Sequence, residues 1–211
     1  MQLDDAVTDA FHQQYYEARA QTWQDTRWLG VPVYKCPLDL WIYQEIIWRV
    51  QPELIVECGT ADGGSAYYFA SLCDLMGRGK ILTIDVNGMP EAGKHPRISF
   101  LQGSSTDPGI VREVKHRTDR AGAVMVVLDS DHSRDHVARE IEAYAPLVTR
   151  GSYLVVEDTN INGHPVRSDW GPGPHEAVDA FLSTTDAFVP DETCQRFMLT
   201  FNPRGWLRRV K

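Results

Sequence analysis

The sequence predicts an α/β fold with one doubly wound, mostly parallel sheet, an antiparallel C-terminal strand and an N-terminal helical extension. Short apolar runs without polar alternation recur along the chain, and such runs predict strands buried on both faces. Segments with helical periodicity separate them, which implies parallel strands joined by right-handed crossovers. The predicted parallel strands cover residues 54–56, 81–84, 98–101, 123–128 and 153–156.

The N-terminal part is predicted to form a helical cover. Apolar residues recur at steps of three or four along residues 1–28, which predicts a helix there: Val7, Phe11, Tyr15 and Ala18. This helix cannot belong to the central sheet, so we expect it to cover a sheet edge, a partner subunit or the substrate mouth. A loop over residues 28–33 precedes a second helix over 37–47, with Pro37 suited to its first position.

The stretch from Leu54 to Asp85 predicts a Rossmann-like nucleoside-binding unit. Three glycines after the first strand mark a tight turn where the backbone approaches something closely: Gly59, Gly63 and Gly64. A helix over 65–75 and a second buried strand follow, and that strand ends in Asp85, about 20 residues past the glycines. Glycines of this kind admit the ligand, and the carboxylate at the second strand binds ribose hydroxyls.

The second half of the chain continues the alternation. The further predicted elements are a loop over 88–97, helices over 108–117, 136–147 and 176–182, a long loop over 163–174, and a closing antiparallel strand over 194–201. We expect one domain of residues 1–211, with 1–50 as the helical cover and 51–211 as the Rossmann-like core.

The glycine turn does not have the NAD fingerprint. Glu57 stands two residues before Gly59, and Gly63 stands four residues after it. This E-x-G-x-x-x-G pattern resembles the first motif of class I S-adenosylmethionine-dependent methyltransferases. Glu57 suits a cationic sulfonium ligand and would repel a phosphate. A dinucleotide site and a purely structural turn are the alternatives.

Acidic residues follow four of the predicted strands: Glu57, Asp85, Asp129 with Asp131, and Glu157 with Asp158. The carboxyl ends of parallel strands lie at one sheet edge, where carboxylates repel one another unless a cation is present. Carboxylate oxygens are ligands that Mg²⁺ prefers, so the last two strand ends predict a metal site. The alternative is that Ser130, Asp131 and Asp158 only cap helices.

Composition limits the class of protein. The chain has 211 residues and a net charge of −8, which argues against an extended nucleic-acid surface. No stretch is apolar enough for a membrane span, and the acidic start does not resemble a signal peptide. The four cysteines form no C-x-x-C pair, so we predict neither a zinc site nor a disulfide framework. We expect a reduced, cytoplasmic protein.

Several segments together resemble the cephalosporin hydroxylase family. The matching segments span nearly the whole chain: 28–32, 37–47, 54–65, 128–133, 153–163 and 197–208. Despite the family's name, its known relatives include class I, metal-dependent O-methyltransferases that act on antibiotic and sugar hydroxyls. The resemblance implies S-adenosylmethionine and Mg²⁺, or a similar divalent ion, as cofactors. It also implies a small-molecule acceptor, a sugar or a secondary metabolite.

The resemblance also implies site residues. Those predicted to bind S-adenosylmethionine are Glu57, Gly59, Thr60, Gly63, Ser65, Asp85, Ser104, Ser105 and Asp129. The metal is predicted to lie on Glu157, Asp158 and one acid of the run 129–131. Ungapped spacing to Glu157 favours Asp131, whereas the arrangement in catechol-type methyltransferases favours Asp129 as the alternate ligand.

The expected mechanism is deprotonation of an acceptor hydroxyl on the metal, followed by in-line attack on the methyl group. His132, beside the acid Asp131, is the predicted base, and His136 lies one turn later. Tyr34, Lys35 and Trp170 are predicted acceptor contacts, and the loop 163–174 is a predicted lid.

Three other functions are compatible with parts of this pattern. A glycosyltransferase would use Asp129-Ser130-Asp131 as a D-x-D motif, and an iron hydroxylase would use His132 and His136 with a carboxylate. A non-catalytic S-adenosylmethionine-binding protein is the third. We expect a homo-oligomer, because an amphipathic N-terminal arm often forms a subunit contact. We also expect the protein to bind neither nucleic acid nor a membrane.

Overall fold

The central feature is a seven-stranded sheet with the order β5-β4-β3-β6-β7-β9-β8. The computed structural model describes residues 5–88, 91 and 94–211. Five neighbouring strands are parallel: β3 (Leu54–Cys58), β4 (Lys80–Asp85), β5 (Ile98–Gln102), β6 (Val124–Leu128) and β7 (Tyr153–Val156). Two antiparallel strands, β9 (Trp206–Arg209) and β8 (Phe188–Pro190), extend the sheet beyond β7. The predicted fold class is confirmed.

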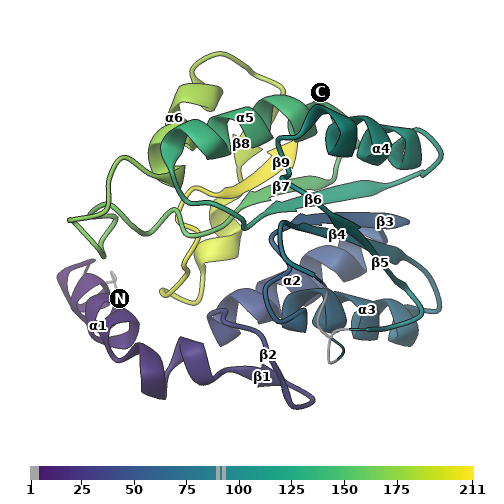
Figure 1. The fold of residues 1–211 in the computed structure, drawn as a ribbon. Helices are drawn as coiled ribbons and strands as arrows, with labels where there is room; N and C mark the ends of the chain where they lie inside the picture. Colours follow the sequence, from purple (N-terminus) through teal and green to yellow (C-terminus); the bar gives the residue numbers. More distant parts are fainter. Residues whose placement is uncertain (1–4, 89–90, 92–93) are drawn as a thin grey trace.

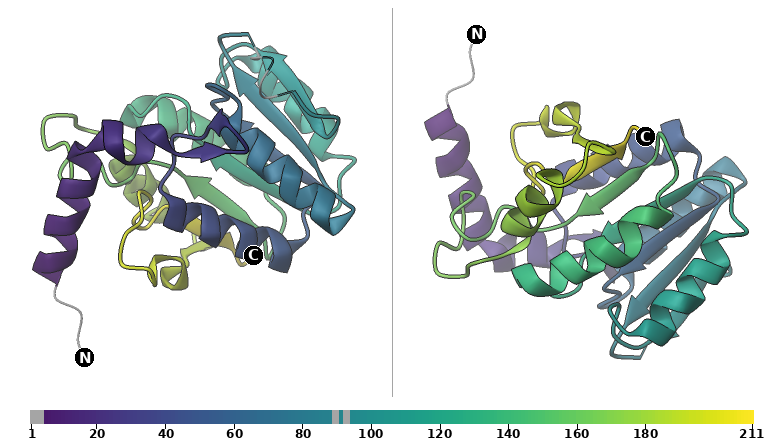
Figure 2. Two further views of the ribbon diagram at one scale, coloured as in Figure 1. Left: turned by 90° about the horizontal axis from the view of Figure 1, so that it is seen from below. Right: turned by 90° about the horizontal axis from the view of Figure 1, so that it is seen from above.

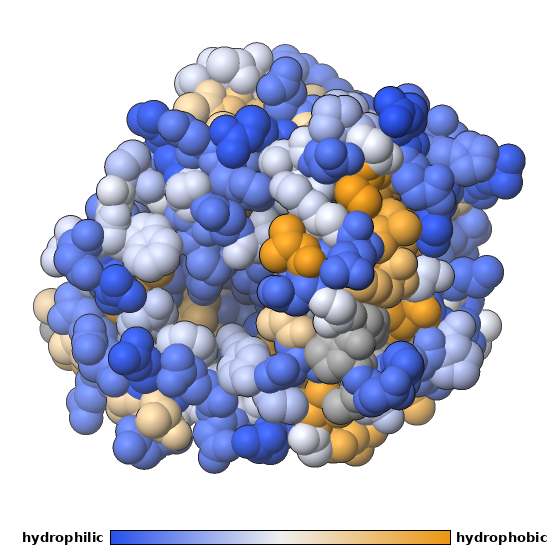
Figure 3. Space-filling view, in the orientation of Figure 1, coloured by the Kyte–Doolittle hydropathy of each residue, from blue (hydrophilic) through white to orange (hydrophobic). Residues whose placement is uncertain are grey.

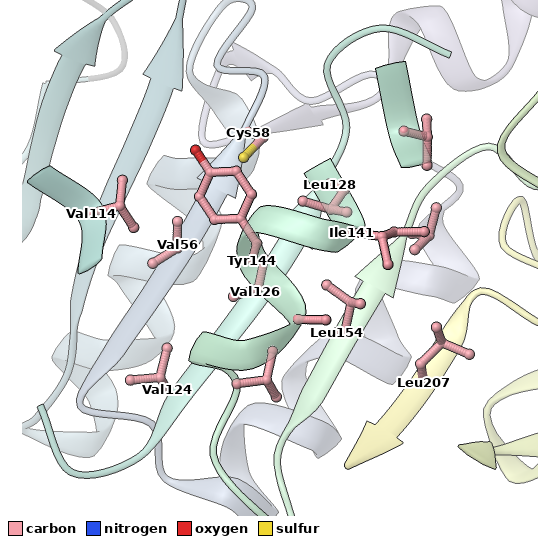
Figure 4. Packing of buried hydrophobic residues seen from close by; sticks show 14 of the residues in the cluster. Val56, Cys58, Val114, Val124, Val126, Leu128, Ile141, Tyr144, Leu154 and Leu207 are labelled. Atoms are coloured by element: carbon pink, nitrogen blue, oxygen red, sulfur yellow. The ribbon is translucent and has the colours of Figure 1, made fainter. Parts of the chain in front are cut away.

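Helices cover both faces of the sheet (Figure 1). One face packs against α2 (Pro37–Val50) and α3 (Gly64–Met76). The other face packs against α4 (Pro108–Thr118), α5 (Arg134–Tyr144) and α6 (Pro174–Leu182). Figure 4 shows Val56, Val126 and Leu154 from three neighbouring strands beside Ile141 and Tyr144 of α5. β3, β6 and β7 are buried on both faces, as their unbroken apolar runs predict, whereas the edge strand β5 is only partly buried.

The N-terminal helix is shorter than predicted. Helix α1 (Asp5–Glu17) ends well before residue 28, and residues 1–4 lie outside the described chain. The Thr22 hydroxyl and the Trp23 indole donate to the carbonyls of Tyr15 and Tyr16, so side chains satisfy acceptors that a longer helix would use. Two short 3₁₀ turns, Arg19–Gln21 and Trp23–Asp25, follow. Figure 2 shows α1 at the margin of the molecule, apart from the sheet.

A small hairpin connects this segment to the core. Strands β1 (Arg27–Trp28) and β2 (Val31–Pro32) pair antiparallel where the sequence predicts a loop. A side chain at Gly64 would lie 1.9 Å from the Pro32 carbonyl oxygen, so the hairpin approaches the start of α3 at backbone contact distance. The predicted loop over 88–97 includes residues 89, 90, 92 and 93, which lie outside the described chain.

The predicted strand over 194–201 is wrong. A 3₁₀ helix (Glu192–Gln195) and an irregular segment occupy these residues, and the closing antiparallel strand is β9. Leu199 and Phe201 pack with Cys36 of the N-terminal part, whereas Cys194 packs in the core cluster beneath α2. The alternation of apolar and polar residues therefore reflects packing onto two separate clusters.

None of the helices in the described chain is long and apolar enough to span a bilayer. Figure 3 shows that the face viewed in Figure 1 is largely hydrophilic, with hydrophobic residues gathered mainly on its right-hand half.

Candidate active site

The candidate site lies where the order of the strands reverses. β3 lies between β4, which follows it in the chain, and β6, which begins the other half of the sheet. The backbone N–H of Gly59 donates to the Ile84 carbonyl, and that of Asp129 donates to the Cys58 carbonyl, each at 2.8 Å. These bonds bring the glycine turn and the acidic run after β6 together, at the place where doubly wound sheets bind ligands.

A cavity of about 470 Å³ opens at this point. Five of the residues predicted to bind the cofactor line it: Gly59, Asp85, Ser104, Ser105 and Asp129. Asp85 Oδ2 accepts from the backbone N–H groups of Thr60 and Ala61, at 2.9 and 3.1 Å. Burial raises the pKa of Asp85, but the backbone donors lower it further, so the net shift is downward. The cavity therefore holds an ionised carboxylate at neutral pH.

Glu57 is fully buried behind the glycine turn. Its Oε2 accepts from the Thr83 hydroxyl at 2.7 Å, whereas Oε1 is buried and has no hydrogen-bond partner in the described chain. Burial raises the pKa of Glu57 to about 7, although Lys35 opposes the shift. An unpartnered carboxylate oxygen at this depth is what a cationic ligand would satisfy.

The other predicted cofactor residues support the turn instead of lining the cavity. The Thr60 hydroxyl lies 2.7 Å from that of Thr83. Gly63 precedes α3 with a φ of 80°, which a residue with a side chain rarely adopts, and Ser65 is buried in the first turn of α3.

Ser105, Ser130 and His136, which line the cavity, join a polar network with Glu140, a residue that the sequence did not reveal. His136 Nε2 lies 3.2 Å from the hydroxyls of both Ser105 and Ser130, and the Ser130 hydroxyl donates to the fully buried Glu140 at 2.6 Å. The hydrogen bond with Glu140 raises the pKa of His136. The four-residue spacing of His136 and Glu140 was the available signal, because it places both on one face of α5.

Asp129, His132 and Asp158 form a cluster that could hold a metal ion. One ligand atom from each lies within 4.8 Å of the others. His132 Nε2 is 3.2 Å from Asp158 Oδ2. Burial raises the pKa values of Asp129 and Asp158, while Lys35 opposes the shift at Asp129 and His132 opposes it at Asp158. Two carboxylates and an imidazole suit a divalent ion.

Glu157 is adjacent to this cluster but is already engaged. Lys35 Nζ lies 2.9 Å from Glu157 Oε1 and 2.6 Å from Asp129 Oδ2. The Tyr43 hydroxyl also donates to Glu157 Oε1. Lys35 is only 3% exposed, so it is a partner of the acids and is not placed to contact an acceptor. The sequence did not reveal Tyr43, because its place in α2 reads as ordinary core.

Asp131 points away from the cluster. Its Oδ1 accepts from the backbone N–H of Ser133 at 2.8 Å and from the Ser133 hydroxyl at 2.5 Å, and these bonds lower its pKa. These bonds shape the turn before α5 but do not cap the helix, because Ser133 is its N-cap residue and no side chain makes a cap hydrogen bond there. Asp131 as a metal ligand and catalytic partner of His132 stays a prediction, and the geometry favours the alternate ligand Asp129.

A second cavity, of about 700 Å³, lies on the other side of the cluster. Its walls include four aromatic residues: Tyr16, Trp23, Tyr34 and Trp170. Ala61, Asp129 and Ser130 line both cavities, so the two spaces meet at the acidic cluster. Figure 3 shows the surface hollowed left of centre, between the N-terminal segment and the strand ends. Another cavity of about 500 Å³ lies at the amino ends of β3 and β4 and contains none of the predicted site residues.

The loop predicted to be a lid is anchored at both ends. Glu176 accepts from the Gly173 backbone N–H at 2.6 Å and from the Asn162 amide at 3.0 Å. The Trp170 indole donates to the His132 carbonyl at 3.1 Å. Trp170 therefore lines the second cavity beside His132, and the role of the loop as a lid stays a prediction.

Sequence comparisons with known proteins find one family, and structural comparison finds a solved structure with the same fold. The family model for Rhamnosyl O-methyltransferase/CmcI matches residues 20–210. A Rhamnosyl O-methyltransferase of Mycobacterium tuberculosis (strain ATCC 25618 / H37Rv) is 40% identical over 215 residues, covering 97% of this chain and 86% of the relative. That of Mycobacterium leprae (strain TN) is 35% identical over 211 residues, covering 97% and 91%. The solved structure of cmcI-D160 with Mg-SAM shares the fold, with a TM-score of 0.67 and 23% identity over 89% of this chain and 78% of that one.

Proposed function

This chain belongs to the Rhamnosyl O-methyltransferase/CmcI family, and from that membership we propose that it transfers a methyl group from S-adenosylmethionine to a sugar hydroxyl of a small molecule, with a divalent metal ion. The predicted resemblance to the cephalosporin hydroxylase family is confirmed, and the activity class is O-methyl transfer. The observation that carries the proposal is the meeting of two cavities at one acidic cluster.

The nucleoside side of the site fits S-adenosylmethionine. Asp85 offers an ionised carboxylate for ribose hydroxyls at the cavity. Glu57, buried behind the glycine turn with a raised pKa, would be stabilised in its ionised form by a positive ligand nearby. Lys35 is the one buried cation beside these acids in the described chain, so a positive ligand improves the charge balance. A dinucleotide would place phosphates near Glu57, which is unfavourable.

The cluster fits a divalent ion. Asp129 and Asp158 are the proposed ligands of the ion, and Glu157 lies beside them. His132, the third member of the cluster, is left free of the ion for proton transfer. A bound ion would supply Lewis acidity, which lowers the pKa of an acceptor hydroxyl. The solved cmcI-D160 structure with Mg-SAM supports both ligands in this fold.

His132 is the proposed base. It lines the second cavity, and its Nε2 faces Asp158, which would stabilise the imidazolium formed when His132 takes the hydroxyl proton. The Trp170 indole fixes the backbone of His132. Asp129 and Ser130, which line both cavities, would align the acceptor oxygen with the methyl carbon, and alignment supplies much of the rate.

The aromatic walls of the second cavity suit a sugar ring, because C–H groups of a pyranose pack on flat aromatic faces. The Mycobacterium relatives named Rhamnosyl O-methyltransferase support a sugar acceptor. The homo-oligomeric state, the cytoplasmic location, the independence of nucleic acid and membranes, and the division at residue 50 stay predictions.

Neither metal-dependent alternative gains support. An iron site with two histidines would need His136 beside His132, but His136 faces Ser105 and Glu140 instead. A D-x-D motif would use Asp129 and Asp131 together, whereas Asp131 is turned toward Ser133.

The test is methyl transfer from radiolabelled S-adenosylmethionine to a panel of rhamnosides and other glycosides, with Mg²⁺ or with EDTA. We expect label in the glycoside only when Mg²⁺ is present. Calorimetric titration with S-adenosylmethionine provides a readout that needs no acceptor. Failure to bind S-adenosylmethionine, or equal turnover in EDTA, would overturn the proposal.

A further inference from the structure

Lys35 is buried against the acids of the candidate metal centre. It follows the β1–β2 hairpin, and its own carbonyl accepts from the Thr26 hydroxyl at 3.2 Å. The hairpin cannot retreat toward α3, because Pro32 already lies against Gly64. The ammonium therefore approaches Asp129 and Glu157 from the side of the N-terminal segment.

The ammonium is charged where it sits. Burial lowers the pKa of Lys35, but the carboxylates of Asp129 and Glu157 raise it more, and the net shift is upward. Its two contacts, 2.6 Å to Asp129 and 2.9 Å to Glu157, are short charge-assisted hydrogen bonds. The positive charge of Lys35 thus lies beside Asp129, a member of the metal cluster, and is paired with the neighbouring acid Glu157.

A divalent ion at the cluster would meet this charge at close range. Asp129 would be shared between Lys35 and the ion, and Glu157 could turn to the ion only by leaving Lys35 and Tyr43. Repulsion between like charges a few ångströms apart is substantial in a partly buried site. Both effects lower the affinity for the ion.

We propose that Lys35 is an intrinsic competitor of the metal, a positioning residue that neutralises Asp129 and Glu157 and keeps the divalent ion weakly bound. This inference rests on the metal site of the proposed function and adds a residue that sets its affinity. A weakly bound ion can leave with the product and return with the next acceptor.

The experiment measures Mn²⁺ binding alone, by the electron paramagnetic resonance signal of the free ion at one neutral pH and ionic strength. We expect Lys35→Met to bind Mn²⁺ at least about tenfold more tightly than the unchanged protein, because one like charge is removed. Lys35→Arg keeps the charge and should stay within about threefold. Lys115→Met, which removes an exposed lysine on α4, is the matched control for net charge and should have no effect.

The opposite result would overturn the inference. If Lys35 only shaped the site for the metal, Lys35→Met would bind Mn²⁺ equally or more weakly. Should Lys35→Met fail to fold, the comparison moves to the Glu157→Gln background, where Lys35→Met should again tighten Mn²⁺ binding. Because no S-adenosylmethionine or acceptor is present, a negative result here is separate from failure of the proposed methyl transfer.

Discussion

The backbone carbonyl oxygen of Asp129 occupies the place where a side chain at Gly59 would begin, with 1.9 Å between that oxygen and an ideal Cβ. The turn after β3 and the acidic run after β6 are thus in direct backbone contact. This contact places the nucleoside cavity next to the metal cluster. Methyl transfer requires such proximity between the methyl donor and the acceptor.

Gly59→Ala should therefore destabilise the protein by more than about 3 kcal/mol, because backbone atoms cannot make room for Cβ. Gly77→Ala is the matched control: its φ is also positive, at 71°, but nothing lies within 4 Å of the added carbon. It should cost about 1–2 kcal/mol, the penalty of the left-handed conformation alone. Urea unfolding measures both, and equal costs would contradict the role given to the contact.

The two aspartates of the run 129–131 should differ sharply when each is changed to asparagine. Asp129→Asn removes a carboxylate from the cluster and should lower kcat/KM by about 100-fold or more. Asp131→Asn weakens only the turn hydrogen bonds from Ser133 and should lower kcat/KM by less than about tenfold. Steady-state kinetics at saturating Mg²⁺ decide, and the reverse order would assign the metal to Asp131.

His132→Gln should lower kcat by about 10²- to 10⁴-fold, the usual contribution of a positioned base. The affinity for S-adenosylmethionine should be unchanged, because His132 lines the acceptor cavity and not the nucleoside cavity. His136→Gln is the companion variant, since His136 lines the nucleoside cavity. It should weaken S-adenosylmethionine binding in calorimetry while sparing kcat; identical effects of the two variants would refute the separate roles.

Acid should release the N-terminal helix through His12. Burial lowers the pKa of His12 from 6.5 to about 4, and its ring stacks on Phe201 with Nε2 2.9 Å from the Asn160 amide. Because the folded pKa is depressed, the unfolded segment binds the proton first, and stability is lost as the pH falls from about 6.5 to about 4. The full loss is about 3 kcal/mol.

This acid effect is measured by urea unfolding at neutral and acidic pH, followed by tryptophan fluorescence. His12→Gln cannot titrate, so its stability should fall less with acid than that of the unchanged protein. Both proteins share every other titratable group, so the difference between their pH curves isolates His12. Parallel curves would show that His12 does not carry the effect.

Much of the fold could be read from local pattern. The five parallel strands and the glycine turn with Asp85 follow from runs of neighbouring residues, and burial on both faces leaves an unbroken apolar signature. The wrong prediction of a strand at residues 194–201 also came from a local pattern, the alternation of apolar and polar residues. Alternation predicts a strand only if all of its apolar side chains pack on one surface. Here Cys194 and Phe201 pack on different clusters.

By itself, the sequence determined that acids and glycines would gather at one edge of a parallel sheet, since chain order and strand direction alone bring strand ends together. Only the tertiary structure decided which acids face one another. The turn at Ser133 draws Asp131 away, and the N-terminal hairpin, nearly 100 residues earlier, delivers Lys35 to Asp129. A side chain's partner depends on packing between distant segments, and spacing along the chain carries no record of it.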